Sequence, residues 1–197
     1  MPLTKCWEKK VPSINPGALQ KLEKIIDEKS KVFEYGTGGS TVWLTKRVGE
    51  LVSVEHNKDW FRILKEGFME TLGGIPDNTT LMLRSGNPVL NDTWVESETT
   101  KEHIGLDFID SILAYPDNYF DLVFVDGRAR MSCLFNSRSK VNPGGFILLD
   151  DSQREWYQDG MGMMADWECR VCRGKDNTEF QGCQSTFFRR PLENANL

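Results

Sequence analysis

A short apolar run that leads into a glycine loop constrains the fold of this chain more than any other feature. The run, from Lys31 to Tyr35, carries an acid at Glu34 and continues as Gly36-Thr37-Gly38-Gly39-Ser40-Thr41, where a helical pattern takes over. This order predicts a strand, a tight turn and a helix N-terminus, which let the backbone approach a nucleotide-like ligand closely. Twenty-one residues after Glu34, a second strand from Leu51 ends in the carboxylate of Glu55. A carboxylate at that point is placed to accept both hydroxyls of a ribose, so the pattern predicts an adenosine-containing cofactor.

The bulk properties of the chain argue against several classes of function. Its 197 residues fit one domain, and 39% hydrophobic with 27% charged residues is typical of a soluble globular protein. The net charge is −5 without a long basic run, so we expect no nucleic-acid partner, because clustered Lys and Arg neutralise phosphates. No apolar stretch approaches the roughly 20 residues of a membrane span, and the N-terminus lacks a signal-peptide core. We expect a cytoplasmic protein; its oligomeric state stays open, with a homodimer as one option.

Strand and helix patterns alternate along the chain. Apolar runs without polar alternation, such as Leu122 to Val125 and Phe146 to Leu149, are typical of parallel strands covered on both faces. The expected fold class is α/β: a Rossmann-like, doubly wound, mostly parallel seven-stranded sheet with a C-terminal antiparallel hairpin. We expect a single domain over 1–197, with an N-terminal helical extension over 1–30 and a substrate-side insertion over 85–114. The expected strands cover about 32–35, 51–55, 79–83, 120–126, 146–151, 168–173 and 183–190. The expected helices cover about 16–29, 40–47, 58–72, 102–114, 130–140 and 153–165. A turn is expected at 142–145.

The glycine loop departs from a dinucleotide-binding fingerprint at two positions. In Gly-x-Gly-x-x-Gly, counted from Gly36, the third glycine falls where this chain has Thr41, and that glycine normally permits close helix–strand packing around a pyrophosphate. Glu34 stands just before the loop, where a carboxylate would repel a pyrophosphate. S-adenosylmethionine carries an ammonium and a sulfonium and no phosphate, so an acid here becomes favourable. We therefore expect S-adenosylmethionine, with an NAD-dependent oxidoreductase as the alternative.

Four segments in order carry a resemblance to class I S-adenosylmethionine-dependent methyltransferases. The segment from Glu34 to Thr41 resembles their motif I, and Ser53 to His56 resembles their second motif. Phe120 to Arg128 and Asn142 to Asp151 resemble the motifs of their fourth and fifth strands. The likeness covers about 31–151, and the closing hairpin matches the strand order of that fold. It implies a methyltransferase fold and activity.

The resemblance also implies a binding site for the methionine part of the cofactor. Gly36 and Gly38 would line it, and Glu34 would steady the loop and the ammonium side. The motif I residues expected to bind the cofactor are Glu34, Tyr35, Gly36, Thr37, Gly38, Ser40 and Thr41.

Further residues are implied for the rest of the cofactor. Glu55 would take the ribose hydroxyls, and His56 would lie beside the adenosine. Asn87, at the end of the segment that follows the third strand, would flank the adenine. Asp126 would face the methyl group that is transferred.

Three acids follow two strands that are expected to be adjacent in the sheet. Asp126, Asp150 and Asp151 would repel one another at one sheet edge unless a cation or a shared proton compensates. A hard ion such as Mg²⁺ or Mn²⁺ suits an all-oxygen site, and the arrangement resembles metal-dependent O-methyltransferases of catechols and of sugars. The metal would then lower the pKa of a substrate hydroxyl. The alternative is that these acids only end strands and cap the loops that follow.

One position departs from the sugar methyltransferases. Where they often carry a second acid as the base, this chain has Arg128. We expect Arg128 to orient an anionic or polyhydroxyl substrate; the alternatives are that Arg128 and Arg130 are surface residues or pair with the acids. Asp151 is a candidate base if it is not a metal ligand. The expected catalytic residues are thus Asp126, Arg128 and Asp151, and the expected reaction is O-methylation of a small polar molecule, sugar or glycan. The non-enzymatic alternative is a methyltransferase-like protein that binds the cofactor without catalysis.

Overall fold

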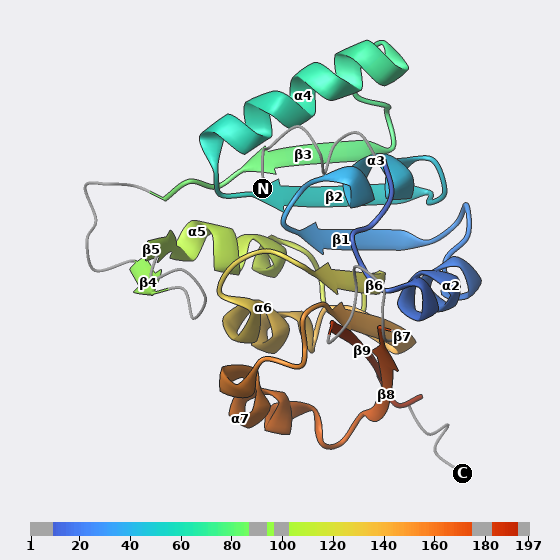
Figure 1. Ribbon diagram of the computed structural model, residues 1–197, viewed down its shortest axis with the longest axis vertical. Helices are drawn as coiled ribbons and strands as arrows, with labels where there is room; N and C mark the ends of the chain where they lie inside the picture. The colour runs from blue at the N-terminus through green and yellow to red at the C-terminus, as the bar shows by residue number, and fades with distance from the viewer. Residues whose placement is uncertain (1–9, 87–93, 97–102, 175–182, 193–197) are drawn as a thin grey trace.

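A mixed β-sheet of seven strands organises the chain, of which the computed structural model describes residues 10–86, 94–96, 103–174 and 183–192. Its order is β3-β2-β1-β6-β7-β9-β8; the first five strands are parallel, and β9 and β8 are antiparallel to their neighbours. The predicted α/β fold with its closing hairpin is confirmed (Figure 1). The strands are β1 (Lys31–Tyr35), β2 (Glu50–Glu55), β3 (Thr79–Leu83), β6 (Phe120–Val125), β7 (Val141–Leu149), β8 (Glu168–Arg173) and β9 (Gln184–Arg189).

The direction of strand addition changes between β1 and β6. From β1 the chain builds one half of the sheet through β2 and β3, and it then crosses over to build the other half from β6 and β7. β1 and β6 are direct neighbours, with Tyr35 paired to Val125 at their carboxyl ends. Open α/β sheets bind ligands at such a switch point. The fold therefore brings the loops after β1 and β6 to the place where a ligand is expected.

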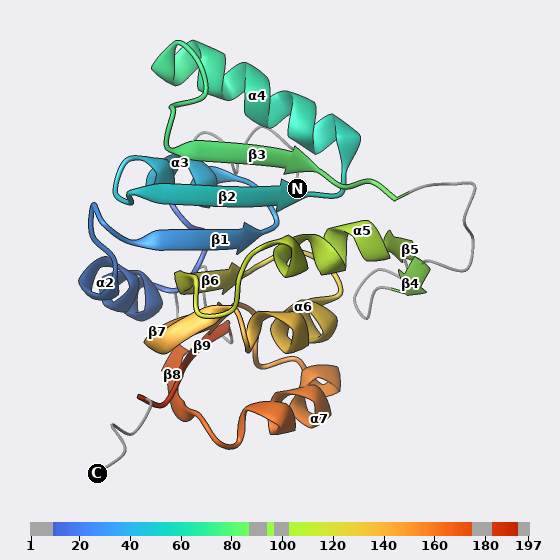
Figure 2. The same cartoon turned by 180° about the vertical axis from the view of Figure 1, so that it is seen from behind.

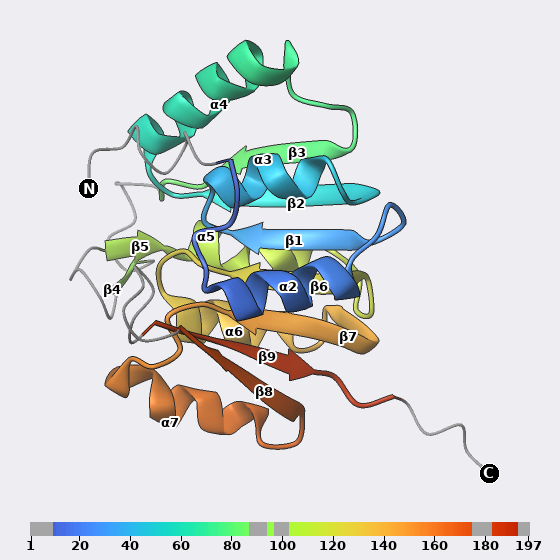
Figure 3. The same ribbon diagram turned by 45° about the vertical axis from the view of Figure 1, so that its right-hand side comes forward.

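Helices cover both faces of the sheet (Figure 3). One core cluster joins α2 and α3 to one face, and a second joins α5 and α6 to the other. A third, small cluster of Val42, Leu64 and Phe68 packs α4 against α3. Among the helices of the described residues, none combines the length and the apolar character that crossing a bilayer requires. The helices are α2 (Pro16–Ile25), α3 (Gly39–Thr45), α4 (Lys58–Leu72), α5 (Leu106–Ile109), α6 (Arg130–Ser137) and α7 (Gln158–Met161), with 3₁₀ turns η2 (Asp110–Ala114), η3 (Glu155–Tyr157) and η4 (Gly162–Met164).

Local sequence signals set the ends of the helices. The Asn15 side chain accepts a hydrogen bond from the Ala18 amide at 2.9 Å, and Pro16 occupies the first turn of α2, where its missing N–H costs nothing. At the far end of α4, Gly73 adopts the left-handed conformation with φ 75°, which ends a helix readily only when the residue is glycine. These boundaries therefore follow from the sequence.

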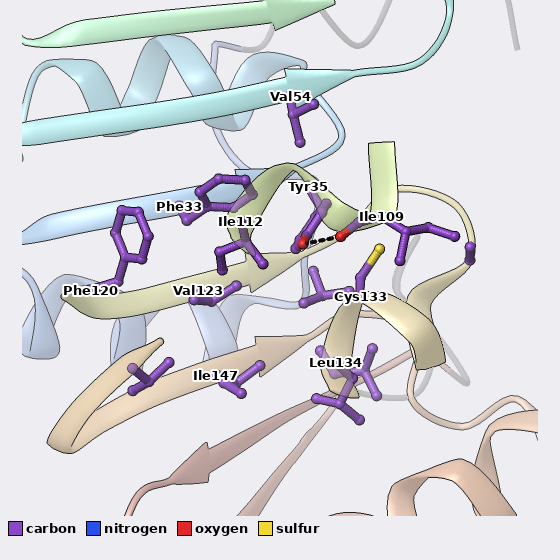
Figure 4. Close-up of a cluster of buried hydrophobic side chains, with 14 of the residues drawn as sticks. Phe33, Tyr35, Val54, Ile109, Ile112, Phe120, Val123, Cys133, Leu134 and Ile147 are labelled. Atoms are coloured by element: carbon purple, nitrogen blue, oxygen red, sulfur yellow. Dashed lines mark hydrogen bonds between the residues drawn. The ribbon is translucent and has the colours of Figure 1, made fainter. Parts of the chain in front are cut away.

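The larger core cluster lies between the sheet and the helices α5 and α6. Figure 4 shows Phe33 and Tyr35 from β1 packed with Ile112 and Cys133, which come from η2 and α6. The Tyr35 hydroxyl donates to the Ile109 carbonyl at 2.8 Å, so the one polar atom of this buried ring is paired. The cluster thereby fixes α5 to the carboxyl half of β1.

The predicted helix over 102–114 begins too early in the sequence. The chain instead forms β5 (His103–Gly105), which pairs antiparallel with β4 (Trp94–Glu96), and helical structure starts only at Leu106. Gly105 is extended, with φ −65° and ψ 141°, and glycine is a poor helix interior residue. The small β4–β5 sheet lies beyond the carboxyl ends of the main strands, together with α5 (Figure 2).

Two further predicted elements differ in the C-terminal half. The expected helix over 153–165 is a series of short turns, η3, α7 and η4, and it contains Gly160 and Gly162, which weaken a continuous helix. The expected turn at 142–145 lies inside β7, whose pairing with β6 shifts register between Phe120 and Leu122. The glycines that suggested a turn, Gly144 and Gly145, belong to the extra residues of β7 at this register shift.

Candidate functional site

The carboxyl half of β1 places an acid beneath the glycine loop. Glu34 is fully buried, and its carboxylate accepts hydrogen bonds from the hydroxyls of Ser40 at 2.5 Å, Thr41 at 2.7 Å and Ser53 at 2.5 Å. Burial raises the pKa of Glu34 to about 7, although the three hydroxyls act in the opposite direction. Glu34 thus ties α3 and β2 to β1, as its predicted loop-supporting role requires. Its predicted place at the ammonium side of the cofactor stays a prediction.

Thr41 accounts for the missing third glycine of the loop. Its hydroxyl accepts a hydrogen bond from the Gly38 amide at 2.9 Å and donates to Glu34. A glycine at this position would leave both the Gly38 amide and the buried acid without that partner. The hydroxyls of Ser40 and Thr41 are therefore part of the support of the loop, and cofactor binding by these residues stays a prediction.

Gly36 and Gly127 bring the loops after β1 and β6 into backbone contact. Gly36 has φ +88°, and a Cβ added to it would lie 2.7 Å from the Gly127 Cα and 2.9 Å from its amide nitrogen. In turn, a Cβ on Gly127 would meet the Gly36 nitrogen at 3.1 Å and the Phe108 ring at 3.0 Å. Gly36 therefore needs glycine for its conformation and its space, whereas a side chain at Gly127 would be tightly packed and would require its neighbours to shift slightly.

The carboxylate of Glu55, at the end of β2, lies against the same loop. One oxygen accepts the Thr37 amide at 3.1 Å and the Thr37 hydroxyl at 2.9 Å, and the other accepts the amides of His56 at 2.9 Å and Asn57 at 2.8 Å. The His56 Nδ1 also lies 2.9 Å from the second oxygen. Burial alone would raise the pKa of Glu55, but the hydrogen bonds and the charge of His56 and the two backbone amides lower it. Glu55 is therefore held as an anion whose acceptor positions are occupied by its own chain.

Thr37 is held at all three of its polar groups. Besides its two bonds to Glu55, its carbonyl accepts the Trp60 indole N–H at 2.5 Å. Trp60 comes from the first turn of α4, whose N-cap Asn57 accepts the Trp60 amide at 2.9 Å, and its ring faces Gly38, where an added Cβ would lie 3.8 Å away. Sequence analysis missed Trp60 because an aromatic residue at helical spacing resembles a core residue.

Two further predicted residues border the site through aromatic packing. The Tyr35 side chain lies wholly in the core, which leaves only its backbone at the loop. The His56 ring packs edge-on against Phe108 of α5, with centroids 5.6 Å apart. Phe108 thus packs against Tyr35 at the end of β1, against His56 after β2 and beside Gly127 after β6, a position that no local pattern indicated. Asn87, the predicted adenine neighbour, lies outside the described residues.

A buried cation links two of the three predicted acids. The Arg130 Nη2 lies 3.0 Å from an Asp126 oxygen and 3.3 Å from an Asp151 oxygen, and the Arg130 side chain is only 4% exposed. Arg154 pairs with the same Asp151 oxygen. The two aspartates therefore meet through Arg130, which was one of the alternatives stated for this residue from the sequence.

Asp150 does not join this group. Its carboxylate accepts the Ser185 hydroxyl at 2.7 Å, and that hydroxyl also accepts the Asn15 side-chain amide at 3.2 Å. Burial, together with the charge of Asp126, raises the pKa of Asp150 to about 8. Both residues follow the end of β7, and Asp151 turns into the left-handed conformation with φ 53°, so the two carboxylates take different partners.

The predicted Mg²⁺ or Mn²⁺ site does not fit the residues as they are arranged. In the described part of the chain, no three His, Cys, Asp or Glu side chains lie so that they could share a metal ion. Asp150 is turned towards Ser185, while Asp126 and Asp151 face the guanidinium of Arg130. The predicted ligands Asp126, Asp150 and Asp151 thus do not come together as a metal site in this arrangement, because Asp126 and Asp151 pair with an arginine and Asp150 is bonded to Ser185.

Asp126 keeps contact with solvent, with 26% of its side chain exposed. Burial raises its pKa to about 6; Arg130 opposes this shift, and the charge of Asp151 adds to it. Such a carboxylate is ionised at neutral pH and is still basic enough to accept a proton. Arg128, the third predicted catalytic residue, lies partly exposed on the same loop, and its role stays a prediction.

Comparison with solved structures shows what this fold is similar to. The S-adenosylmethionine-dependent O-methyltransferase TM0748 from Thermotoga maritima matches with a TM-score of 0.64 and 11% identity, over 94% of this chain and 69% of that one. The tRNA (m1A58) methyltransferase TrmI from Aquifex aeolicus matches with 0.58 and 13%, over 87% and 66%. TYW2 from M. jannaschii, solved in complex with AdoMet, matches with 0.54 and 13%, over 91% and 76%. The sequence matches no family model and no curated protein. The chain therefore has the fold of class I S-adenosylmethionine-dependent methyltransferases.

Proposed function

We propose that this chain is an S-adenosylmethionine-dependent methyltransferase that methylates a hydroxyl of a small polar molecule or sugar. The observation that carries the proposal is the glycine loop at the switch point of the sheet, enclosed by Glu34 below and Glu55 beside it. An ionised Glu55 suits ribose hydroxyls and repels a phosphate. The methyltransferase fold supports the same cofactor.

The loop amides disfavour the NAD alternative. A dinucleotide pyrophosphate binds through free backbone N–H groups at a helix N-terminus. Here the Thr37 amide donates to Glu55 and the Gly38 amide donates to Thr41. Two N–H groups that a phosphate needs are thus already satisfied, one of them by a carboxylate. A cofactor without phosphate loses nothing from this arrangement.

Asp126 is the residue that we propose as the general base. It follows β6 directly beside Gly127, which contacts the cofactor loop at Gly36. In the reaction, the acceptor oxygen bonds to the methyl carbon while the carbon–sulfur bond breaks, so the sulfonium becomes a neutral thioether. The acceptor proton passes to the Asp126 carboxylate. Because the predicted metal ligands do not fit a metal, no step is assigned to one.

A small acceptor is favoured over a nucleic acid. The net charge of −5 opposes a polyanion. The carboxylates of Asp126 and Asp151 at this edge of the sheet instead suit an acceptor that presents hydroxyl groups as hydrogen-bond donors. The tRNA methyltransferase with the same fold makes RNA the necessary comparison in the assay.

Calorimetric titration tests the cofactor part of the proposal. S-adenosylhomocysteine is expected to bind the purified chain with 1:1 stoichiometry, and NAD is expected not to bind. Glu55→Gln, which keeps the shape but removes the charge, is expected to weaken that binding roughly tenfold or more. Binding of NAD without S-adenosylhomocysteine would overturn the proposal.

The acceptor is tested with labelled S-adenosylmethionine against a panel of polyols, sugars, phenols, amines and bulk tRNA. Label is expected to enter a hydroxyl compound, and the transfer is expected to survive a chelator. Incorporation into tRNA or into an amine would contradict the proposed acceptor while leaving the cofactor assignment intact.

A further inference from the structure

We propose that Arg130 is the resident cation of the acceptor site: it takes the place that a divalent metal would hold between the strand-end acids, and it positions Asp126 for catalysis. The inference rests on the proposed function, because it assigns Asp126 to the acceptor. Three observations support the inference. Every nitrogen of the Arg130 guanidinium has a hydrogen-bond partner, and two residues beside the guanidinium have unusual backbone conformations. Asp150 also lies apart from the two acids that Arg130 holds.

All three nitrogens of the guanidinium have partners on the loops after β6 and β7. Nε donates to the Gly127 carbonyl at 3.0 Å, and Nη1 donates to the Asp150 carbonyl. Nη2 reaches one carboxylate oxygen of Asp126 at 3.0 Å and one of Asp151 at 3.3 Å. Only a planar fork of N–H donors can reach carbonyls and carboxylates of two loops in this way.

The backbone on both sides of the guanidinium adopts a conformation that non-glycine residues rarely take. Ala129, directly before Arg130, has φ 49°, and Asp151 has φ 53°. Such left-handed residues persist when the surrounding structure holds them, and they gather at functional sites. Ala129 is the N-cap of α6, and its left-handed turn lets the helix begin with the Arg130 side chain buried and not exposed to solvent. At Asp151 it turns the carboxylate towards the same guanidinium.

The charges make the arginine a substitute for a metal. Asp126 and Asp151 together bring two negative charges to one sheet edge, and without a cation one of them would have to take up a proton. Arg130 stays protonated at any working pH, so both can remain ionised. The ion pairs use one oxygen of each carboxylate, Oδ1 of Asp126 and Oδ2 of Asp151, and the second oxygen of each stays outside them. A metal would instead withdraw lone pairs from both acids.

Manganese binding to the full chain tests this inference without any acceptor. Wild type, Arg130→Met and Arg130→Lys are each titrated with MnCl₂, and bound Mn²⁺ is followed by its electron paramagnetic resonance signal and by the melting temperature. Methionine keeps the length and removes the charge, which leaves Asp126 without its cation and Asp151 with Arg154 alone. Arg130→Met is expected to bind about one Mn²⁺ and to gain about 3 °C or more from it. Wild type and Arg130→Lys are expected to do neither.

Two further variants separate a cation site from a merely structural arginine. The Mn²⁺ effect on Arg130→Met is expected to vanish when Asp126→Asn is added, because the ion then loses a ligand. If Arg130→Met is unfolded alone, its refolding is expected to need Mn²⁺, and refolding that ignores Mn²⁺ would overturn the inference. Wild-type Mn²⁺ binding that Asp126→Asn abolishes would overturn it as well. S-adenosylhomocysteine titration of the same samples reports on the proposed function separately.

Discussion

The carboxylate of Glu55 accepts both the amide and the hydroxyl of Thr37, at 3.1 and 2.9 Å, in the free protein. These are bonds of the kind that a ribose hydroxyl would make with the same oxygen. A ligand that binds Glu55 through its ribose must therefore replace at least the hydroxyl of Thr37, because each carboxylate oxygen has about two acceptor positions.

Replacing the competing hydroxyl is expected to strengthen cofactor binding. Thr37→Val keeps the shape and the backbone amide but frees one acceptor position on Glu55. The affinity for S-adenosylhomocysteine, measured by calorimetry, is expected to rise by roughly threefold to tenfold, the worth of one modest hydrogen bond. Thr37→Ser retains the hydroxyl and is the matched control, expected to bind like wild type. A weaker Thr37→Val would mean that the hydroxyl contacts the cofactor directly.

Glu34 is expected to make the stability of the protein fall with rising pH. Burial raises its pKa from 4.5 to about 7, so the folded state holds this proton more tightly than the unfolded chain does. Its contribution is complete below pH 4.5 and is lost as the pH rises through 7, by about 3 kcal/mol at most. Glu34→Gln, which does not titrate, is expected to show a flatter decline of the unfolding free energy between pH 5 and pH 8 in urea. Equal slopes for the two proteins would show that this carboxyl titrates normally.

Asp126 is expected to give methyl transfer an acidic limb near pH 6. Only the ionised carboxylate can accept the acceptor proton, and burial raises its pKa to about 6. The rate at saturating S-adenosylmethionine should thus rise with pH through about 6 and then level off. Asp126→Asn should lower it by roughly 10²- to 10⁴-fold, the usual worth of a general base, with the affinity for S-adenosylhomocysteine nearly unchanged. A full rate in Asp126→Asn would remove this residue from the mechanism.

The contact between Gly36 and Gly127 can be separated from the strain of a positive φ. Gly36→Ala places a methyl group 2.7 Å from the Gly127 Cα, at φ +88°. Gly73→Ala imposes a similar φ of +75° with no atom within 4 Å, so it reports the conformational cost alone, about 1 kcal/mol. Gly36→Ala is expected to cost about 3 kcal/mol of unfolding free energy, because overpacking adds to the strain, and to abolish cofactor binding. Similar losses in the two variants would place the whole effect in the backbone conformation.

The sequence was a good guide to the sheet and to the cofactor loop for one physical reason. Apolar runs such as Leu122 to Val125 must be covered on both faces, and glycines with strand-end acids occur where backbone and ligand meet. Those features are local in the chain, and the structure places them as expected. The prediction of a helix over 102–114 was wrong at its start, because Gly105 is extended and helical structure begins only after it.

The acceptor side was harder to predict because its chemistry depends on long-range contacts. Arg130 sits in the first turn of a helix, where an arginine usually faces solvent, and its burial follows from the left-handed turn at Ala129. One available signal was overlooked. Asp150 and Asp151 are consecutive at a strand end, and the alternation of side chains predicts that they face opposite ways. The alternation alone argues against placing both on one metal.

The paired glycines at 36 and 127 have a consequence for how such a protein changes over generations. The loops after β1 and β6 approach each other through main-chain atoms of Gly36 and Gly127. On the proposed function these loops carry the methyl donor and the acceptor, so residues around Asp126 could be exchanged, and a new acceptor adopted, while the approach of the two loops is inherited intact. Conversely, a side chain gained at either glycine would meet main-chain atoms of the other loop. The two positions should thus be kept or lost together, whatever molecule receives the methyl group.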